Sequence, residues 1–290
     1  MPATPPQLPL MPRIARTAFI AALAALSLGC PGVANALAQD APPVFVVRAH
    51  SAHLGPEGGY LKDRGGSRVI VFVHGFSSGP DADFRCDDDH NWPEMIAGDR
   101  DPLLSSTDVY VLGYPDPPRR GKTAVAALET SLVDRMAAAG IFSRHQDVVF
   151  VAHAMGGLLI QQVLEQNARA DWIRKIRAVF LLGTPRGTSK LAGFGKYIDA
   201  DPRLKEMEGN GNNFILHPEA PLWTGVPHHC AYETVSDDGF SSVDYERNTR
   251  GCTDRRAIPA NRASIAKPCQ VSDPTYTYLE DKLHALFPSR

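Results

Sequence analysis

Short apolar runs alternate along this sequence with longer stretches in which apolar residues recur at helical spacing. Six of the apolar runs predict strands, at 44–48, 68–74, 108–114, 147–152, 177–182 and 229–235. Helices are predicted at 91–96, 123–139, 156–167 and 276–286. Continuous apolar strands are typical of parallel sheets that are covered on both faces. The alternation therefore predicts an α/β fold with a mainly parallel, twisted sheet, right-handed crossovers and helices on both faces.

The chain is long enough for one sizeable core, with 290 residues of which 43% are hydrophobic and 21% are charged. A net charge of −2 argues against a nucleic-acid partner, because such proteins are usually basic. Periodicity is weaker at 192–227, which predicts either a small lid-like insert or an ordinary surface excursion. We expect a single domain over residues 39–290.

The N-terminus has the features of a secretory signal peptide over residues 1–38. Arg13 and Arg16 precede an apolar stretch at 17–29, which is too short to span a bilayer comfortably. The A-x-A pattern Ala36-Leu37-Ala38 predicts cleavage before Gln39 and a periplasmic or secreted protein without a transmembrane segment in the mature chain. Lipoprotein anchoring at Cys30 is the less favoured alternative.

Four cysteines remain after such a cleavage: Cys86, Cys230, Cys252 and Cys269. An even number in an exported chain predicts two disulfides, with three connectivities open, whereas buried free thiols are the alternative. No CxxC spacing indicates a zinc site. The acidic run that ends in His90 has metal-ligand chemistry, but solvated loop charges explain it better. We therefore expect no metal and no organic cofactor.

One segment combines a buried strand, a tight turn and a helix start. Residues 147–157 read Asp-Val-Val-Phe-Val-Ala-His-Ala-Met-Gly-Gly, with small residues where the chain turns sharply. Upstream, the strand at 68–74 ends in a His-Gly pair. Each of these two strands is therefore predicted to end in a tight turn.

These motifs, together with Tyr110-Val-Leu-Gly-Tyr114 and Leu181-Leu-Gly-Thr-Pro185, resemble the lipase-like serine esterases of the α/β-hydrolase superfamily, which include relatives of GPI inositol deacylases. The similarity covers most of the mature chain. It implies an α/β-hydrolase fold and hydrolysis of carboxylic esters by a Ser-His-Asp triad. The family's nucleophile elbow, Gly-x-Ser-x-Gly, matches residues 152–156, which places Ala154 at the nucleophile position and Gly156 at the last glycine.

The resemblance also implies an oxyanion hole, formed by the backbone N–H groups of Phe76 and Met155. These donors do not depend on a serine side chain. His153 occupies the position before the nucleophile, where we expect it to pack beside the elbow without a catalytic role. A methyl group cannot attack a carbonyl, so Ala154 removes the nucleophile.

The base and the acid of the triad are assigned from the same resemblance. The segment at 258–268 matches the region in which such esterases carry Asp-His or Asn-His; Asn261 fits the pattern, but Arg262 replaces the base. A guanidinium stays protonated and cannot accept a proton. The acid is expected after the strand at 229–235, where Asp238 is preferred over Asp237 and Asp244. Without a histidine to orient, Asp238 is predicted to pair with Arg262.

Other histidines fall outside the base position, namely His90, His228, His229 and His284. The sequence therefore predicts a catalytically impaired hydrolase that binds a lipid-like or ester ligand, or a partner protein, in its former active site. The alternative is an active exported esterase whose nucleophile was changed from Ser to Ala. A scaffold role, as in a toxin or an assembly component, has no repeat, heptad or basic stripe to support it. Aromatic and aliphatic residues of the insert favour lipid-like ligands over sugars.

Overall fold

A single eight-stranded sheet organises the computed structural model, which describes residues 46–47, 54–75, 79–115, 122–184, 225–235 and 249–288. The strands are β1 (Val46–Val47), β2 (Gly58–Asp63), β3 (Arg68–Val73), β4 (Asp108–Leu112), β5 (Asp147–His153), β6 (Ile176–Leu182), β7 (His228–Glu233) and β8 (Asp254–Ile258). Their order is β1-β2-β4-β3-β5-β6-β7-β8. From β4 to β8 every neighbouring pair is parallel, whereas β1 and β2 pair antiparallel at one edge.

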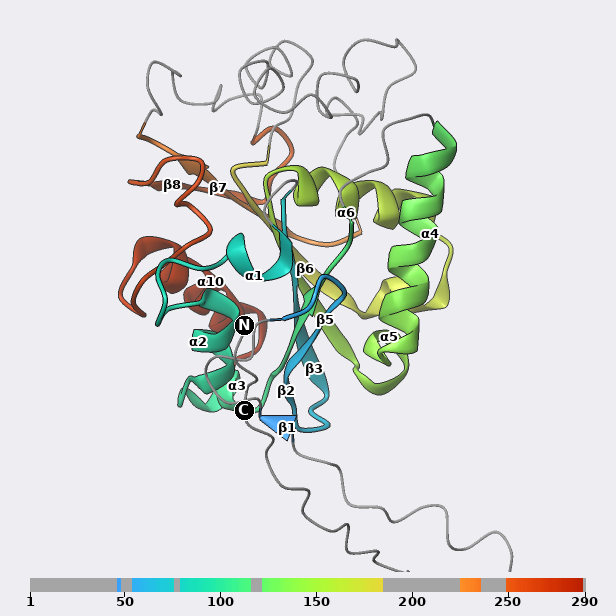
Figure 1. Ribbon diagram of the computed structural model, residues 1–290, viewed down its shortest axis with the longest axis horizontal. Helices are drawn as coiled ribbons and strands as arrows, with labels where there is room; N and C mark the ends of the chain where they lie inside the picture. The colour runs from blue at the N-terminus through green and yellow to red at the C-terminus, as the bar shows by residue number, and fades with distance from the viewer. Residues whose placement is uncertain are drawn as a thin grey trace, which may run out of the picture. The chain divides into compact units, whose positions relative to one another are not determined.

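Helices lie on both faces of this sheet (Figure 1). They are α1 (Gly79–Ala82), α2 (Trp92–Gly98), α3 (Pro102–Ser105), α4 (Lys122–Ala138), α5 (Ile141–Arg144), α6 (Met155–Gln166), the 3₁₀ helix η1 (Asp171–Lys175) and α10 (Pro274–Leu286). One apolar core joins α4, α5 and α6 to one face of the sheet, and a second joins α2, α3 and α10 to the other. The predicted α/β fold with a mainly parallel sheet and two helical layers is therefore confirmed.

Local sequence explains where several of these elements begin and end. The helix α2 starts at Asn91, whose side-chain oxygen accepts a hydrogen bond from the backbone N–H of Glu94, and Pro93 occupies its first turn. The strands β3, β4 and β5 are almost wholly buried, as their continuous apolar sequences predict. The central sheet and its long helices are thus encoded locally.

Two strands lack a sequence signal and are not among the predicted elements. The strand β2 contains Gly58, Gly59 and a lysine, and β8 reads Asp-Arg-Arg-Ala-Ile. Other boundaries also differ: β1 has two residues, β4 ends at Leu112, and β7 ends at Glu233. The strand β8 lies at an edge of the sheet, where polar residues are tolerated because one side of the strand is solvated. The strand β2 lies between β1 and β4, and its glycines and its lysine hide it from a search for apolar runs.

A buried lysine fastens β2 to the helices beneath it. Lys62 is fully buried, and its ammonium group donates hydrogen bonds to the carbonyl oxygens of Leu104, at 2.7 Å, and Ile96, at 3.4 Å. Burial, followed by the charge of Arg64, lowers the pKa of Lys62 to about 8. Lys62, which makes β2 difficult to recognise in the sequence, therefore connects this strand to α2 and α3 through buried hydrogen bonds.

A buried His–Asp pair lies beside the starts of β4 and β5. The side chains of His145 and Asp108 are both fully buried, with Nε2 3.2 Å from Oδ2. The other ring nitrogen lies 3.1 Å from the carbonyl oxygen of Ile141. Although burial opposes ionisation, His145 and the N–H groups of Arg64 and Gly66 hold the pKa of Asp108 below its ordinary value. This pair lies at the opposite end of β5 from the elbow.

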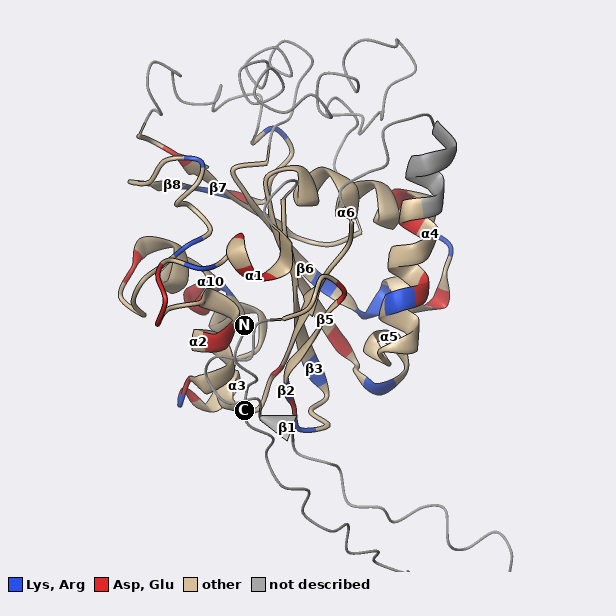
Figure 2. Ribbon diagram, viewed as in Figure 1, with Lys and Arg blue, Asp and Glu red and all other residues tan. Residues whose placement is uncertain are grey.

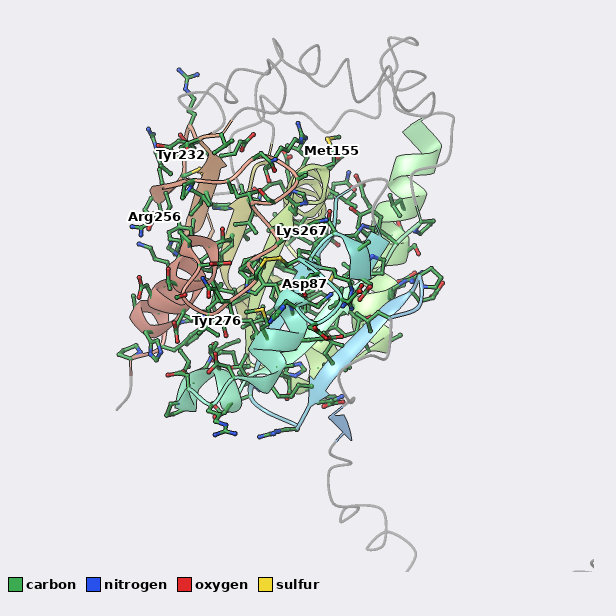
Figure 3. All side chains as sticks on the ribbon, turned by 60° about the vertical axis from the view of Figure 1, so that its left-hand side comes forward. Asp87, Met155, Tyr232, Arg256, Lys267 and Tyr276 are labelled. Carbon is green, nitrogen blue, oxygen red and sulfur yellow. A yellow bond between two sulfur atoms is a disulfide. The ribbon has the colours of Figure 1, made fainter. Side chains whose placement is uncertain are left out.

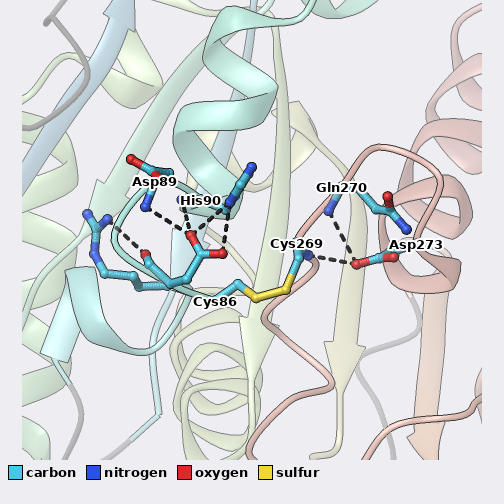
Figure 4. Close-up of a disulfide and its surroundings, with 8 residues drawn as sticks. Cys86, Asp89, His90, Cys269, Gln270 and Asp273 are labelled. Atoms are coloured by element: carbon cyan, nitrogen blue, oxygen red, sulfur yellow. Dashed lines mark hydrogen bonds and ion pairs between the residues drawn. A yellow bond between two sulfur atoms is a disulfide. The ribbon is translucent and has the colours of Figure 1, made fainter.

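Two disulfides connect distant segments of the chain. Cys86 is bonded to Cys269, and Cys230 to Cys252. The first joins the loop after α1 to the segment that leads into α10, as Figure 4 shows. The structure thus pairs all four cysteines that follow the predicted signal and selects one of the three connectivities.

Charges are distributed over the described elements without a continuous basic stripe (Figure 2). Acidic and basic residues lie near one another on several elements, and ion pairs join some of them, such as Arg85 with Asp81. None of the helices among the described residues has the length and hydropathy needed to cross a membrane. The predicted signal peptide, residues 1–38, and most of the predicted insert, 192–227, lie outside the described residues.

Candidate active site

The turn after β5 has the strained backbone of a nucleophile elbow. Ala154 has φ 47° and ψ −122°, and it is the one non-glycine residue with positive φ in the described part of the chain. Such a conformation is costly for a residue with a Cβ and is found where surrounding structure enforces it. Here the N–H of Ala154 donates to the carbonyl of Leu182 at 2.9 Å. The position that faces the site therefore keeps its strained backbone while it carries only a methyl group.

Close packing explains the small residues around the elbow. A Cβ on Gly156 would lie 2.2 Å from the carbonyl oxygen of His74, and one on Gly157 would lie 2.1 Å from Oγ1 of Thr184. A Cβ on Gly75 would be 3.4 Å from the Cβ of Ala154. The His-Gly bend after β3 thus lies directly against the elbow, as the motifs predict.

Part of the predicted oxyanion hole lies within the described residues. Met155 is the first residue of α6, so its N–H belongs to the first turn, which has no intrahelical acceptors. Figure 3 shows Met155 at the same end of the molecule as Tyr232, near the end of β7. Phe76, the second predicted donor, lies outside the described residues. Its neighbour Gly75 is in place beside Ala154.

The bend that precedes Phe76 is fixed by a stacked aromatic pair. The rings of His74 and Tyr114 stack with centroids 4.0 Å apart. The N–H of Tyr114 donates to Nε2 of His74 at 3.3 Å, and the Tyr114 hydroxyl donates to the His74 carbonyl. On the other side of the ring, Nδ1 of His74 donates to the Gly75 carbonyl at 2.5 Å. With polar contacts on both ring nitrogens, His74 serves as a structural residue of the bend.

His153, immediately before Ala154, has polar contacts on both sides of its ring. Its Nδ1 lies 2.8 Å from Oδ2 of Asp83, and its Nε2 lies 3.1 Å from the carbonyl oxygen of Arg262. The same Asp83 oxygen accepts a hydrogen bond from the N–H of Gly75 at 2.7 Å. Asp83 has no part in the sequence prediction, because nothing in its local sequence marks it as a partner for a residue 70 positions away.

Arg262, the residue at the predicted base position, lies in the loop that follows β8. The contact between its carbonyl and His153 places this loop beside the elbow. Within the loop, Asn261 caps a turn: its side-chain oxygen accepts from the N–H of Ser264 at 2.9 Å, and its carbonyl accepts from the N–H of Ile265. The sequence alignment that assigned Arg262 thus corresponds to a loop in contact with the elbow. The predicted acid, Asp238, and the alternatives Asp237 and Asp244 lie outside the described residues, as does the predicted pairing with Arg262.

A buried acid at the end of β7 was not predicted. The Glu233 side chain is 3% exposed, and its Oε2 has no hydrogen-bond partner among the residues that the structure describes. This oxygen would lie 3.3 Å from a Cβ on Gly183, which would also contact Ile265 of the base loop. A small pocket lies beside the ends of β6 and β7, with Thr184 and Glu233 in its lining. The sequence does contain a signal that could have identified Glu233, because a charged residue at the end of the largely buried strand β7 is unusual.

The other histidines are engaged away from the elbow. His90 contacts Asp87, His284 contacts Asp101, His228 contacts Gln161 and His229 contacts Asp254. Burial lowers the pKa of His229, which Asp254 opposes. None of these contacts involves a residue of the elbow or of the loop after β8. The structure therefore offers no replacement for the base among them.

Two groups of side chains within the described residues have metal-ligand atoms close together. One contains Cys86, Asp87 and Cys269, but its two sulfurs form a disulfide. The hydrogen bond from His90 is the main cause that lowers the pKa of Asp87 in the neighbouring loop. The other group is Asp101, Glu280 and His284, which already includes a His–Asp contact of 3.1 Å. Neither group borders the elbow.

Comparison with known proteins gives the family but not the substrate. Solved structures with a similar arrangement include a thioesterase of the prodiginine biosynthetic pathway from Streptomyces coelicolor, with 16% identity, a TM-score of 0.44 and coverage of 76% of this chain and 90% of that one. Carboxylesterase CesB from Bacillus subtilis is 12% identical, with a TM-score of 0.41 and coverage of 81% of this chain and 92% of that one. A lipase-esterase related protein from Clostridium acetobutylicum is 11% identical, with a TM-score of 0.44 and coverage of 77% of this chain and 95% of that one. No curated protein matches the sequence.

The sequence profile of the alpha/beta hydrolase family matches residues 70–283, which include β3, the elbow, the loop after β8 and most of α10. The match spans well over half of the chain, and the strand order and the strained turn at Ala154 agree with it. The chain belongs to the alpha/beta hydrolase family.

Proposed function

We propose that this protein is an exported lipase- or carboxylesterase-type hydrolase that has lost ester hydrolysis and acts by binding a lipid-like or ester ligand in the former active site. The observation that carries the proposal is the elbow itself. Ala154 keeps the strained φ of 47° but has no nucleophilic atom. Only backbone interactions with an oxyanion and binding of the substrate remain in such a site, and these alone support modest rates.

The loop after β8 supports the same conclusion. The carbonyl oxygen of its residue Arg262 contacts the ring of His153, and this contact beside the elbow supports the assignment of the loop to the base position. A guanidinium has five donors and no acceptor, so it cannot take a proton from a nucleophile. A single engineered change explains Ala154 but does not explain Arg262.

The intact elbow also favours a second candidate, an active serine esterase whose nucleophile was replaced. Strain at a turn is costly to keep, and it persists at sites where it positions a reacting group. In that case another group must act as the base. The two candidates make opposite predictions for the turnover of the single variant Ala154→Ser.

Hydrolysis of short- and medium-chain nitrophenyl esters tests the proposal. Four versions are compared: the chain as given, Ala154→Ser, Arg262→His, and the double variant. We expect no robust turnover from Ala154→Ser alone. If that single change restores turnover, the second candidate is correct. Robust hydrolysis by the chain as given would overturn the proposal of lost catalysis outright.

Matched controls separate restored chemistry from incidental changes. Ala168→Ser places a serine on an exposed residue beyond α6, and Arg256→His places a histidine on the exposed face of β8. Neither is expected to alter turnover. A fluorophosphonate labels an activated serine and does not require the correct substrate. If a variant is labelled but does not hydrolyse the nitrophenyl esters, its serine is activated and the esters offered are not its substrates. Calorimetric titration with octanoate tests binding by the chain as given.

Glu233 gives the proposal a further test. If the double variant is active, its histidine needs a carboxylate to orient it, and Glu233 is a second candidate beside Asp238. Glu233→Gln and Asp238→Asn in the double variant distinguish the two. Loss of the orienting acid is expected to reduce kcat by about 10⁴-fold, as in related triads.

A further inference from the structure

Three segments of the candidate site meet at one buried His–Asp contact. His153 ends β5, Asp83 follows α1, and Arg262 belongs to the loop after β8. The ring of His153 lies between the other two, 2.8 Å from Oδ2 of Asp83 and 3.1 Å from the carbonyl of Arg262. The side chains of His153 and Asp83 are 7% and 6% exposed. Hydrogen bonds to solvent therefore do not substitute readily for this contact.

The carboxylate of Asp83 has a second role in the same place. Its Oδ2 also accepts the N–H of Gly75 at 2.7 Å. Gly75 directly precedes Phe76, and its backbone lies against Ala154. One carboxylate oxygen thus holds both the His-Gly bend and the ring of His153.

Both partners of the His153 ring offer acceptor oxygens. A carboxylate oxygen faces Nδ1, and a carbonyl oxygen faces Nε2; both are acceptors. An imidazolium that donates from both nitrogens satisfies both contacts, whereas a neutral ring satisfies one. Buried ion pairs contribute little net stability, but loss of one partner leaves the other charge without compensation. Such a pair is better suited to fix an arrangement than to stabilise the fold.

A covalent bond joins two of the same segments. Cys86 follows Asp83 closely in sequence, and it is bonded to Cys269, which lies between the base loop and α10 (Figure 4). The loop after α1 and the loop after β8 are thus held together both by the disulfide at the surface and by His153 in the interior. Two independent links between these segments indicate that their relative position matters.

We infer that His153 is a positioning residue: through Asp83 and the carbonyl of Arg262, it holds the His-Gly bend at 74–75 and the base loop at 259–266 against the elbow. This inference deepens the proposed function, because it concerns the geometry of the same site. It goes beyond packing beside the elbow, since it assigns His153 a link between two segments that are far apart in the sequence.

Hydrogen exchange followed by mass spectrometry tests the link without any need for turnover. In Asp83→Asn, we expect amide exchange to accelerate by about tenfold or more in peptides that cover both 70–75 and 259–266, because a charge-assisted hydrogen bond is lost. The two regions should respond together. Unchanged exchange in the base loop would overturn the inference.

The second buried His–Asp pair provides a matched control. Asp108→Asn disrupts the contact with His145 at the opposite end of β5. It is expected to lower global stability without a selective increase in exchange at 259–266. If both variants affect the base loop equally, His153 has only a structural role and the inference fails.

Two further measurements keep the inference falsifiable if Asp83→Asn does not fold. Nitrogen-15 spectra of the His153 ring in the unmodified protein should show protons on both nitrogens; an unprotonated nitrogen would contradict the proposed link. His153→Gln, introduced into the double variant Ala154→Ser/Arg262→His, should lower kcat more than it raises KM. If the double variant is inactive, the spectra and exchange still decide the inference, whereas the proposed function is judged by its own assays.

Discussion

A Cβ placed on Gly156 would lie 2.2 Å from the carbonyl oxygen of His74 and 2.9 Å from that of Val73. The start of α6 and the end of β3 therefore approach so closely that only glycine fits between them. Because both obstructing atoms belong to the backbone, a side-chain rearrangement cannot relieve the contact. This approach brings the oxyanion bend and the elbow together.

Gly156→Ala is expected to destabilise the protein by about 1–3 kcal/mol or more, because the backbone must move to admit the methyl group. Gly98→Ala is the control, since a Cβ there meets nothing within 4 Å. That change should be neutral or should stabilise by about 0.4–1 kcal/mol. Urea denaturation of both variants measures the difference, and equal midpoints would contradict the close approach.

Ala154→Gly is expected to stabilise the protein. Relief of a sparsely populated backbone conformation is worth about 1–3 kcal/mol, and glycine costs about 0.5–1 kcal/mol through the entropy of the unfolded chain. The net gain should be between about 0 and about 2.5 kcal/mol. Ala152→Gly, two residues earlier in β5 and without positive φ, should destabilise instead. Chemical denaturation measures both changes; destabilisation by Ala154→Gly would show that the elbow is unstrained.

Because Lys62 is buried, we expect the free energy of unfolding to rise at alkaline pH. Burial lowers its pKa from 10.5 to about 8 in the folded protein. Between these values the unfolded chain binds more protons than the folded one, so the free energy of unfolding increases with pH. The contribution of this residue amounts to about 3 kcal/mol between pH 8 and 10.5.

Lys62→Met should remove most of that rise, although the loss of two hydrogen bonds lowers the starting value. Lys267→Met, at a partly exposed position, should retain it. Denaturation at a series of pH values from 7 to 10.5 provides the measurement. If the free energy of unfolding depends on pH equally in Lys62→Met and in the unmodified protein, titration of Lys62 is not the cause of the rise.

The two disulfides are expected to contribute unequally to stability. Cys86–Cys269 spans 183 residues and Cys230–Cys252 spans 22. In the chain-entropy description, loops of these lengths correspond to about 5 and about 3 kcal/mol. Replacing each pair by alanines and measuring the free energy of unfolding tests the order. A larger loss from the shorter loop would indicate that packing of the buried Cys230, rather than chain entropy, dominates.

The sequence by itself determined the central architecture. The apolar runs of β3, β4, β5 and β6 are long enough to identify buried strands, and the spacing of apolar residues in α4, α6 and α10 identifies helices. The small residues at 152–157 and the His-Gly pair indicated two tight turns, each after a strand. These features are local, because strand and helix periodicities are visible within a few residues.

Tertiary structure decided what local patterns do not encode. The strands β2 and β8 form because neighbouring strands provide hydrogen-bond partners for polar sequences, and Lys62 becomes buried because two helix ends offer it carbonyl oxygens. Asp83 reaches His153, and Glu233 comes to lie beside Gly183, through contacts between residues far apart in the chain. The sequence alone showed that a nucleophile is missing at Ala154. Only the folded chain revealed the contacts that hold its surroundings in place, because they depend on distances between segments rather than on residue order.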